Sequence, residues 1–118
     1  MTRARGTFGA FIRQKREARN IGLREMAKMI GVSPTYLSKV ERDEFAPPAE
    51  DKVKALAEII EWDVDDLLAR ANRVSSDLSE IIKQRPVQVA KFLREVRELG
   101  PDDLRRLNLI LGEWRGKR

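Results

Sequence analysis

Residues 22–42 constrain this chain more than any other stretch, because they encode two short helices and the turn between them. The first helix has apolar residues that share one helical face, Met26, Ala27 and Ile30. Gly31 follows at the point where a helix end favours a residue that tolerates positive φ. Ser33 is a favoured N-cap residue, and Pro34 suits the first position of the next helix, where its missing N–H has no intrahelical partner to lose.

The second helix of this pair has an inward face and an outward face. Leu37 and Val40 lie at helical spacing and are expected to face the core. The residues left facing outward are polar or amphipathic: Thr35, Tyr36, Ser38, Lys39 and Arg42. This pattern predicts a helix-turn-helix whose second helix carries the kinds of side chain that read a DNA groove. Two other interpretations stay open, a Tyr36 that packs on the domain surface and a Lys39 that is only solvated.

Three further helices are expected around this pair. A first helix begins after Thr7, its expected cap, and runs to about Arg19. A fourth helix follows two prolines over about residues 49–61, and an aspartate caps a short fifth helix. Phe45, in the loop before the prolines, is expected to tuck back into the core. Five helices over residues 7–72 make a complete small all-α domain.

The helical pattern restarts after a short linker at residues 73–76. Helices are predicted over about residues 77–84, from Pro86 to Leu99, and from residue 101 onward, the last apolar over more than one face. A helical hairpin within residues 77–114 is too small to bury this much apolar surface alone. We therefore expect it to meet the first domain or the same hairpin of a second copy. The candidate dimerisation residues are Phe92, Val96, Leu107, Ile110, Leu111 and Trp114.

Composition narrows the classes of function. The 118 residues include no cysteine and no histidine, which excludes disulfides and any thiol or imidazole chemistry and leaves no expected metal site or cofactor. The acid pairs at residues 65–66 and 102–103 stand at predicted helix starts, where carboxylates stabilise the helix dipole, so an enzyme is not expected. No apolar run approaches membrane-spanning length and nothing resembles a signal peptide, so we expect a soluble, cytoplasmic protein.

The net charge of +5 suits a polyanionic partner, and its distribution is uneven. Residues 1–20 carry six basic residues against one acid, whereas residues 47–72 carry three against seven. Positive charge thus flanks the helix-turn-helix on its N-terminal side. A solvated charged surface remains the alternative explanation for this distribution.

The first half of the chain resembles the phage-repressor and Cro type of helix-turn-helix domain, the XRE-like family. The resemblance runs through residues 24–42 almost position for position, and it includes the Pro48 loop and the Leu56-Ala57 helix that follow. It implies a compact five-helix domain and operator binding as a dimer. It also implies that Arg16 and Glu41 form the family's structural ion pair between the first and third helices.

Several positions depart from the family pattern. Pro34 stands where many relatives have a base-reading glutamine, so base readout is expected to begin at the next residue. Leu23 stands where relatives often have a phosphate-gripping glutamine, a role left to Arg24. Lys15 replaces a common leucine, with its stem available to fill the gap, and Asp43 replaces a common glycine.

These observations together predict a sequence-specific regulator of transcription that binds double-stranded DNA. Arg13, Arg24 and Arg42 are the candidates for phosphate contacts; Thr35, Ser38 and Lys39 are the candidates for base contacts, with Tyr36 against the backbone. A homodimer held by residues 77–114 would place two copies of residues 34–42 on a near-palindromic operator, most simply as a repressor. The alternative is an antitoxin-like or other protein-interaction module that binds a partner protein as well as DNA.

Overall fold

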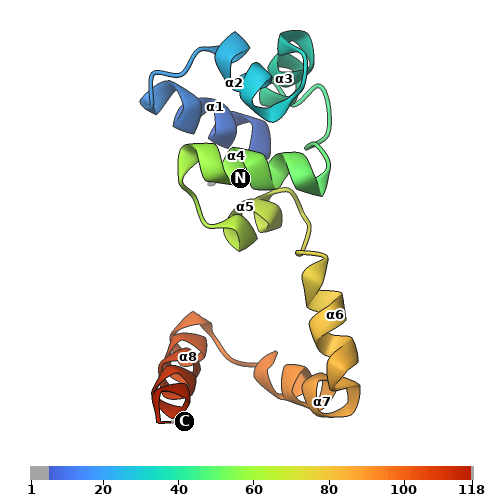
Figure 1. Ribbon diagram of the computed structural model, residues 1–118, viewed down its shortest axis with the longest axis vertical. Helices are drawn as coiled ribbons and strands as arrows, with labels where there is room; N and C mark the ends of the chain where they lie inside the picture. The colour runs from blue at the N-terminus through green and yellow to red at the C-terminus, as the bar shows by residue number, and fades with distance from the viewer. Residues whose placement is uncertain (1–5, 118) are drawn as a thin grey trace. The chain divides into compact units, whose positions relative to one another are not determined.

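The computed structural model describes residues 6–117, which form eight helices and no strands, so the predicted all-α class is confirmed (Figure 1). The chain divides into two compact units, with the boundary between Ser75 and Ser76.

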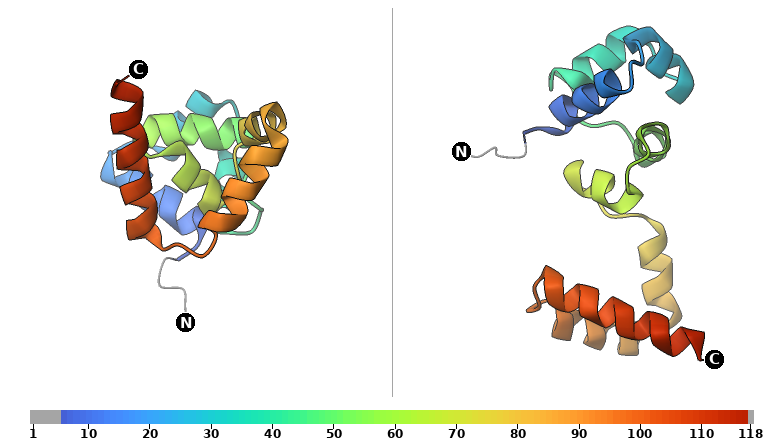
Figure 2. Two further views of the ribbon diagram at one scale, coloured as in Figure 1. Left: turned by 90° about the horizontal axis from the view of Figure 1, so that it is seen from below. Right: turned by 90° about the vertical axis from the view of Figure 1, so that its left-hand side faces the viewer.

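The first unit contains five helices, as the sequence predicts. They are α1 (Phe8–Ala18), α2 (Leu23–Ile30), α3 (Pro34–Glu41), α4 (Glu50–Ile60) and α5 (Val64–Arg70). Figure 2 shows α4 crossing beneath the layer formed by α1, α2 and α3, with α5 following it. The order is that of a helix-turn-helix, α2 and α3, supported by three surrounding helices.

The helices begin and end at the capping residues that the sequence predicts. The hydroxyl of Thr7 accepts a hydrogen bond from the N–H of Ala10, and the hydroxyl of Ser33 accepts one from the N–H of Tyr36. Gly31 ends α2 with a φ of 77°, and Asn20 follows α1 with a φ of 58°. Such side-chain caps typically contribute about 1 kcal/mol each to stability.

The core of the first unit draws on every one of its helices. Its fully buried side chains face one another across α1 to α5, and the largest are Ile12, Met26, Leu37, Leu56, Ile60, Leu67 and Leu68. These are the positions that helical periodicity assigns to the inner faces. The inward residues of α3, Leu37 and Val40, are each 1% exposed, which fixes the rotation of that helix.

Phe45 does not reach this core, so the expectation that it tucks inward is wrong. Its side chain is 44% exposed and packs on the surface against the ring of Tyr36. Pro48, in the same loop, is buried.

Part of the segment interpreted as a linker, residues 73–76, is held against the first unit. The guanidinium of Arg73 donates hydrogen bonds to the backbone oxygens of Pro47 and Pro48, and Ser75 is buried. Arg73 and Ser75 are therefore held on the first unit, whereas Val74 between them is 76% exposed.

Lys15 behaves as its amphipathic side chain suggests. Its ammonium lies 4.4 Å from the ring centroid of Trp62, which in turn meets Phe11 edge to face with centroids 5.0 Å apart. Arg70 covers the Phe11 ring at 4.0 Å and donates to Asp66 at 2.9 Å. Trp62 is thus a half-buried packing residue among α1 and α5.

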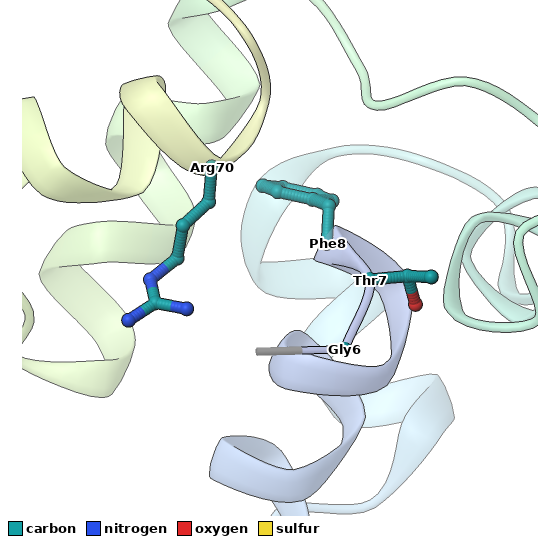
Figure 3. Close-up of a pocket in the computed structure, with 4 residues that line it drawn as sticks. All are labelled: Gly6, Thr7, Phe8 and Arg70. Carbon is teal, nitrogen blue, oxygen red and sulfur yellow. The ribbon is translucent and has the colours of Figure 1, made fainter. Parts of the chain in front are cut away.

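A small pocket next to Arg70 is lined by Gly6, Thr7 and Phe8 and has a volume of about 200 Å³ (Figure 3). Its one charged lining group, Arg70, is already engaged by Asp66 and by the Phe11 ring. The contacts of Arg70 with Asp66 and the Phe11 ring explain why an arginine lies beside this pocket, so the pocket gives no reason to infer a ligand.

The second unit contains α6 (Asp77–Gln84), α7 (Pro86–Val96) and α8 (Pro101–Gly116). None of its described side chains, over residues 76–117, is buried. A groove of about 1090 Å³ runs between α6 and α7 on one side and α8 on the other, lined by Leu78, Ile81, Phe92, Leu111 and Trp114 among others. The predicted hairpin is therefore open, with its apolar residues facing a groove.

No helix within the described range is long and apolar enough to cross a membrane. The same residues contain no cluster of acidic side chains with the grouping that a metal ion requires.

Candidate nucleic-acid interface

The orientation of α3 is fixed by a buried ion pair between Arg16 of α1 and Glu41 at its end. The guanidinium donates from Nε and Nη2 to the two carboxylate oxygens of Glu41, at 2.8 and 2.9 Å, and from Nη1 to the backbone oxygen of Ile21 at 2.9 Å. The hydrogen bond with Glu41 raises the pKa of Arg16 above its ordinary value, against the opposing effect of burial. This two-pronged geometry ties α1 to α3 and to the start of the turn before α2.

The beginning of α1 is pressed against the end of α3. A Cβ on Gly9 would lie 2.2 Å from the backbone oxygen of Val40, so only glycine fits there. Asp43 follows α3 with a φ of 61°, and its carboxylate accepts from the hydroxyl of Thr7 at 2.5 Å and from the N–H of Gly9 at 3.2 Å. Asp43 thus adopts the left-handed conformation at the position where the family pattern commonly has glycine. Its carboxylate adds hydrogen bonds to α1 that a glycine could not form.

The face of α3 turned away from the core carries the side chains that the sequence selects for base contacts. Thr35 is exposed, and Ser38 and Lys39 are half-buried. Their spacing of three and four residues from Thr35 places them on one helical face. Tyr36 is half-buried and packs against the edge of the core, which fits its alternative interpretation as a surface-packed residue.

Two of the three candidate phosphate ligands border the same depression as Ser38. Arg13 and Arg42 line a hollow of about 230 Å³, with Ser38, Leu23 and the Arg16–Glu41 pair forming its other walls. Each of these two arginines has an acidic partner. Arg13 pairs with Glu17 at 3.1 Å, and Arg42 pairs with Glu44 at 2.7 Å.

Arg24 lies apart from that hollow, on the first turn of α2. Its side chain is exposed, and within residues 6–117 it forms no ion pair or hydrogen bond. Leu23, at the start of the same helix, is half-buried and packs on the core, so it offers no polar contact.

Two residues that sequence reasoning did not select stand directly beside the outward face. Glu44 holds Arg42, and Phe45 contacts Tyr36 and the ammonium of Lys39. The available signal was an aromatic residue in the loop three residues after Arg42, and it was interpreted as a core residue.

The paired carboxylates serve the helices in which they stand. Asp65 and Asp66 lie in the first turn of α5, and Asp102 and Asp103 lie in the first turn of α8. Asp66 also accepts from the indole N–H of Trp62 at 2.5 Å. These positions are ones where acids stabilise the helix dipole.

Comparison with known proteins places residues 12–67 in one family, because they match the profile described as Helix-turn-helix. A Mycobacterium tuberculosis protein named as an uncharacterized HTH-type transcriptional regulator is 36% identical over 63 residues, which are 53% of this chain and 44% of that protein. The ImmF control region 10 kDa protein of Bacillus phage phi105 is 36% identical over 60 residues, covering 51% of this chain and 66% of that one. The chain spans about half the length of the curated relatives it matches.

Two solved structures are similar to this chain over different parts of its length. The SinR protein/SinI protein complex has a chain that is 20% identical, with a TM-score of 0.50 over 95% of this chain and all of that one. The P22 c2 repressor in complex with a synthetic operator is 31% identical, with a TM-score of 0.47 over 52% of this chain and 91% of that one. Residues 12–67 of this chain are therefore a helix-turn-helix domain of the XRE type.

Proposed function

We propose that this chain regulates transcription by binding double-stranded DNA in a sequence-specific manner, with α3 inserted into the major groove. The observation that carries the proposal is the outward face of α3. Its polar residues Thr35, Ser38 and Lys39 project from a helix whose inner side is locked by the core and by the buried Arg16–Glu41 pair. A rigidly held helix with such side chains suits readout of base edges.

Base contacts and phosphate contacts fall to different residues in this proposal. Lys39 donates to guanine O6 or N7, and Thr35 and Ser38 contact neighbouring base edges. Arg13, Arg24 and Arg42 contact phosphates, with Tyr36 against the sugar-phosphate backbone. The names of curated relatives as HTH-type transcriptional regulators support the proposed role in transcription.

We further propose that the chain acts as a homodimer, because one short helix reads too few base pairs for a specific site. The exposed apolar residues of the second unit supply the surface. Phe92, Ile110, Leu111 and Trp114 are between 42% and 62% exposed, and Val96 and Leu107 are half-buried. Burying these side chains against a second copy would stabilise α6 to α8, which have no buried core of their own.

A two-fold dimer places two α3 helices in successive major grooves, about 34 Å apart, on a near-palindromic site. Bound there, the protein would repress by blocking RNA polymerase, the simplest outcome of occupying an operator.

Selection of bound sequences from a random DNA pool, at 150 mM salt, tests the proposal. We expect enrichment of a site with two related half-sites whose centres are about 10 base pairs apart. Enrichment of a single half-site would contradict the dimer alone, and the absence of any enriched sequence would contradict sequence-specific DNA binding.

A further inference from the structure

Phe45 is an exposed aromatic residue that contacts two of the side chains assigned to DNA. Its ring centroid lies 5.7 Å from that of Tyr36 and 5.2 Å from the ammonium of Lys39. At 44% exposure it contributes little to the core, and the buried cluster of the first unit excludes it. The main contacts of this ring that the structure shows are thus with the outward side of α3.

The backbone that carries Phe45 is held to α3 rather than left as a loose loop. The N–H groups of Glu44 and Phe45 both donate to the backbone oxygen of Lys39, at 2.8 and 3.2 Å. Asp43, just before them, has its carboxylate tied to Thr7 and Gly9 at the start of α1. The backbone at Phe45 is therefore held relative to the helix on which Lys39 stands, and the ring lies against Tyr36 and Lys39.

A fixed ring restricts where the Lys39 ammonium can lie. A lysine side chain in water samples many rotamers, and ordering it has an entropic cost. A cation over an aromatic face is attracted to it, so some of that ordering is complete before DNA arrives. A preordered donor makes its contact at a lower entropic cost. Because it is held at one position, it favours a base whose acceptor lies at that position over a base whose acceptor lies elsewhere.

We propose that Phe45 is a positioning residue for sequence readout: it holds the Lys39 ammonium and the Tyr36 ring at set positions and thereby determines the base preference read by Lys39. The inference rests on the proposed function, because it concerns how α3 reads DNA. It assigns no contact with DNA to the Phe45 ring itself.

The test compares Phe45→Leu with Phe45→Tyr in the full-length chain. Leucine keeps an apolar side chain but removes the aromatic face, whereas tyrosine retains the face. Fluorescence anisotropy gives affinities for the selected site and for the same site with the Lys39-contacted base pair changed. For Phe45→Leu we expect the ratio of these affinities to fall about three- to tenfold, the size of one lost cation–π contact. Affinity for unrelated DNA should change less than this ratio, because Lys39 reads no preferred base there, and Phe45→Tyr should keep the wild-type ratio.

A double-mutant cycle with Lys39→Ala separates positioning from a general structural role. In the Lys39→Ala background, Phe45→Leu should no longer alter discrimination at that base pair. NMR of the free protein adds a readout without DNA, since the Lys39 side-chain protons over the ring should be shifted upfield and should lose that shift in Phe45→Leu. Thermal unfolding of each variant shows whether the fold is intact.

The possible results distinguish failure of this inference from failure of the proposed DNA-binding function. A wild-type chain without any preferred site would contradict the proposed function and this inference with it. A wild-type chain with a preferred site, and a Phe45→Leu variant with the same discrimination, would overturn the inference alone.

Discussion

Arg16 and Glu41 form a buried ion pair in the first unit, with side chains only 10% and 4% exposed. Removing one partner leaves a buried charge without compensation, which typically costs about 3–5 kcal/mol. We expect Glu41→Ala to lower the free energy of unfolding by an amount in this range. Denaturant titration followed by circular dichroism measures the loss.

The matched control for that prediction is Glu17→Ala, which breaks the exposed pair of Arg13 and Glu17. Both side chains are more than half exposed, so the expected loss is below about 1 kcal/mol. Equal losses in Glu41→Ala and Glu17→Ala would show that the buried pair does not hold α3 in place.

Gly9 tests the close approach of α1 to the end of α3. Alanine is favoured over glycine in a helix by about 1 kcal/mol, yet its Cβ at this position would lie 2.2 Å from one backbone oxygen and 2.7 Å from the next. We expect Gly9→Ala to lower the melting temperature. Gly112→Ala is the control, because its Cβ in α8 would meet only the end of Arg115 at 3.9 Å. An unchanged or raised melting temperature in Gly9→Ala would mean that this contact is looser than the structure shows.

Glu44 competes with DNA phosphate for Arg42, since the two side chains are paired at 2.7 Å. We expect Glu44→Gln to tighten DNA binding and to steepen the dependence of log affinity on log salt by up to about 0.9, the effect of one further phosphate contact. Anisotropy titrations at several salt concentrations measure both quantities. The control is Glu80→Gln in the second unit, where Glu80 pairs with Lys83. It changes the net charge by the same amount as Glu44→Gln, and it should change the affinity and its salt dependence less. Similar results for both variants would show an effect of net charge alone and would contradict competition between Glu44 and DNA phosphate for Arg42.

At the scale of single helices, the sequence was most informative where backbone chemistry allows few choices. Ser33 and Pro34 start α3, and Gly31 ends α2 in the left-handed region, as their residue types require. The inner face of α3 also followed from the spacing of Leu37 and Val40. Local rules suffice for such features because each involves residues within one helical turn.

Features that depend on the path of a loop were not predictable in the same way. The orientation of Phe45 depends on the left-handed turn at Asp43, which is stabilised by Thr7 and Gly9 from another helix. The anchoring of Arg73 depends on two carbonyl oxygens 25 and 26 residues earlier in the chain. Neither contact leaves a periodic signal in the sequence, so one was assigned to the core and the other to a linker.

At the scale of the whole molecule, the second unit presents more apolar surface than it covers. Its groove is lined by Phe92 and Leu111, which are 47% and 42% exposed. If this surface joins two copies, Leu111→Asp should convert a dimer into a monomer in sedimentation velocity, because a charge buried in an apolar interface is costly. Val87→Asp, at a residue that is 75% exposed and outside the groove lining, should leave the dimer intact. A wild-type chain that sediments as a monomer at micromolar concentration would contradict this role for α6 to α8.

The central claim is that the outward face of α3 reads DNA sequence, and Lys39 tests it most directly. The measurement is an anisotropy titration of Lys39→Ala on the selected site. The control is Lys91→Ala, at an exposed residue of α7. The first variant loses one base contact, and the second loses one charge far from α3 in the sequence. A base contact of this kind contributes about 1–3 kcal/mol, so Lys39→Ala should bind the site roughly five- to a hundredfold more weakly and lose preference at one base pair of each half-site. Wild-type affinity and wild-type preference in Lys39→Ala would contradict the claim.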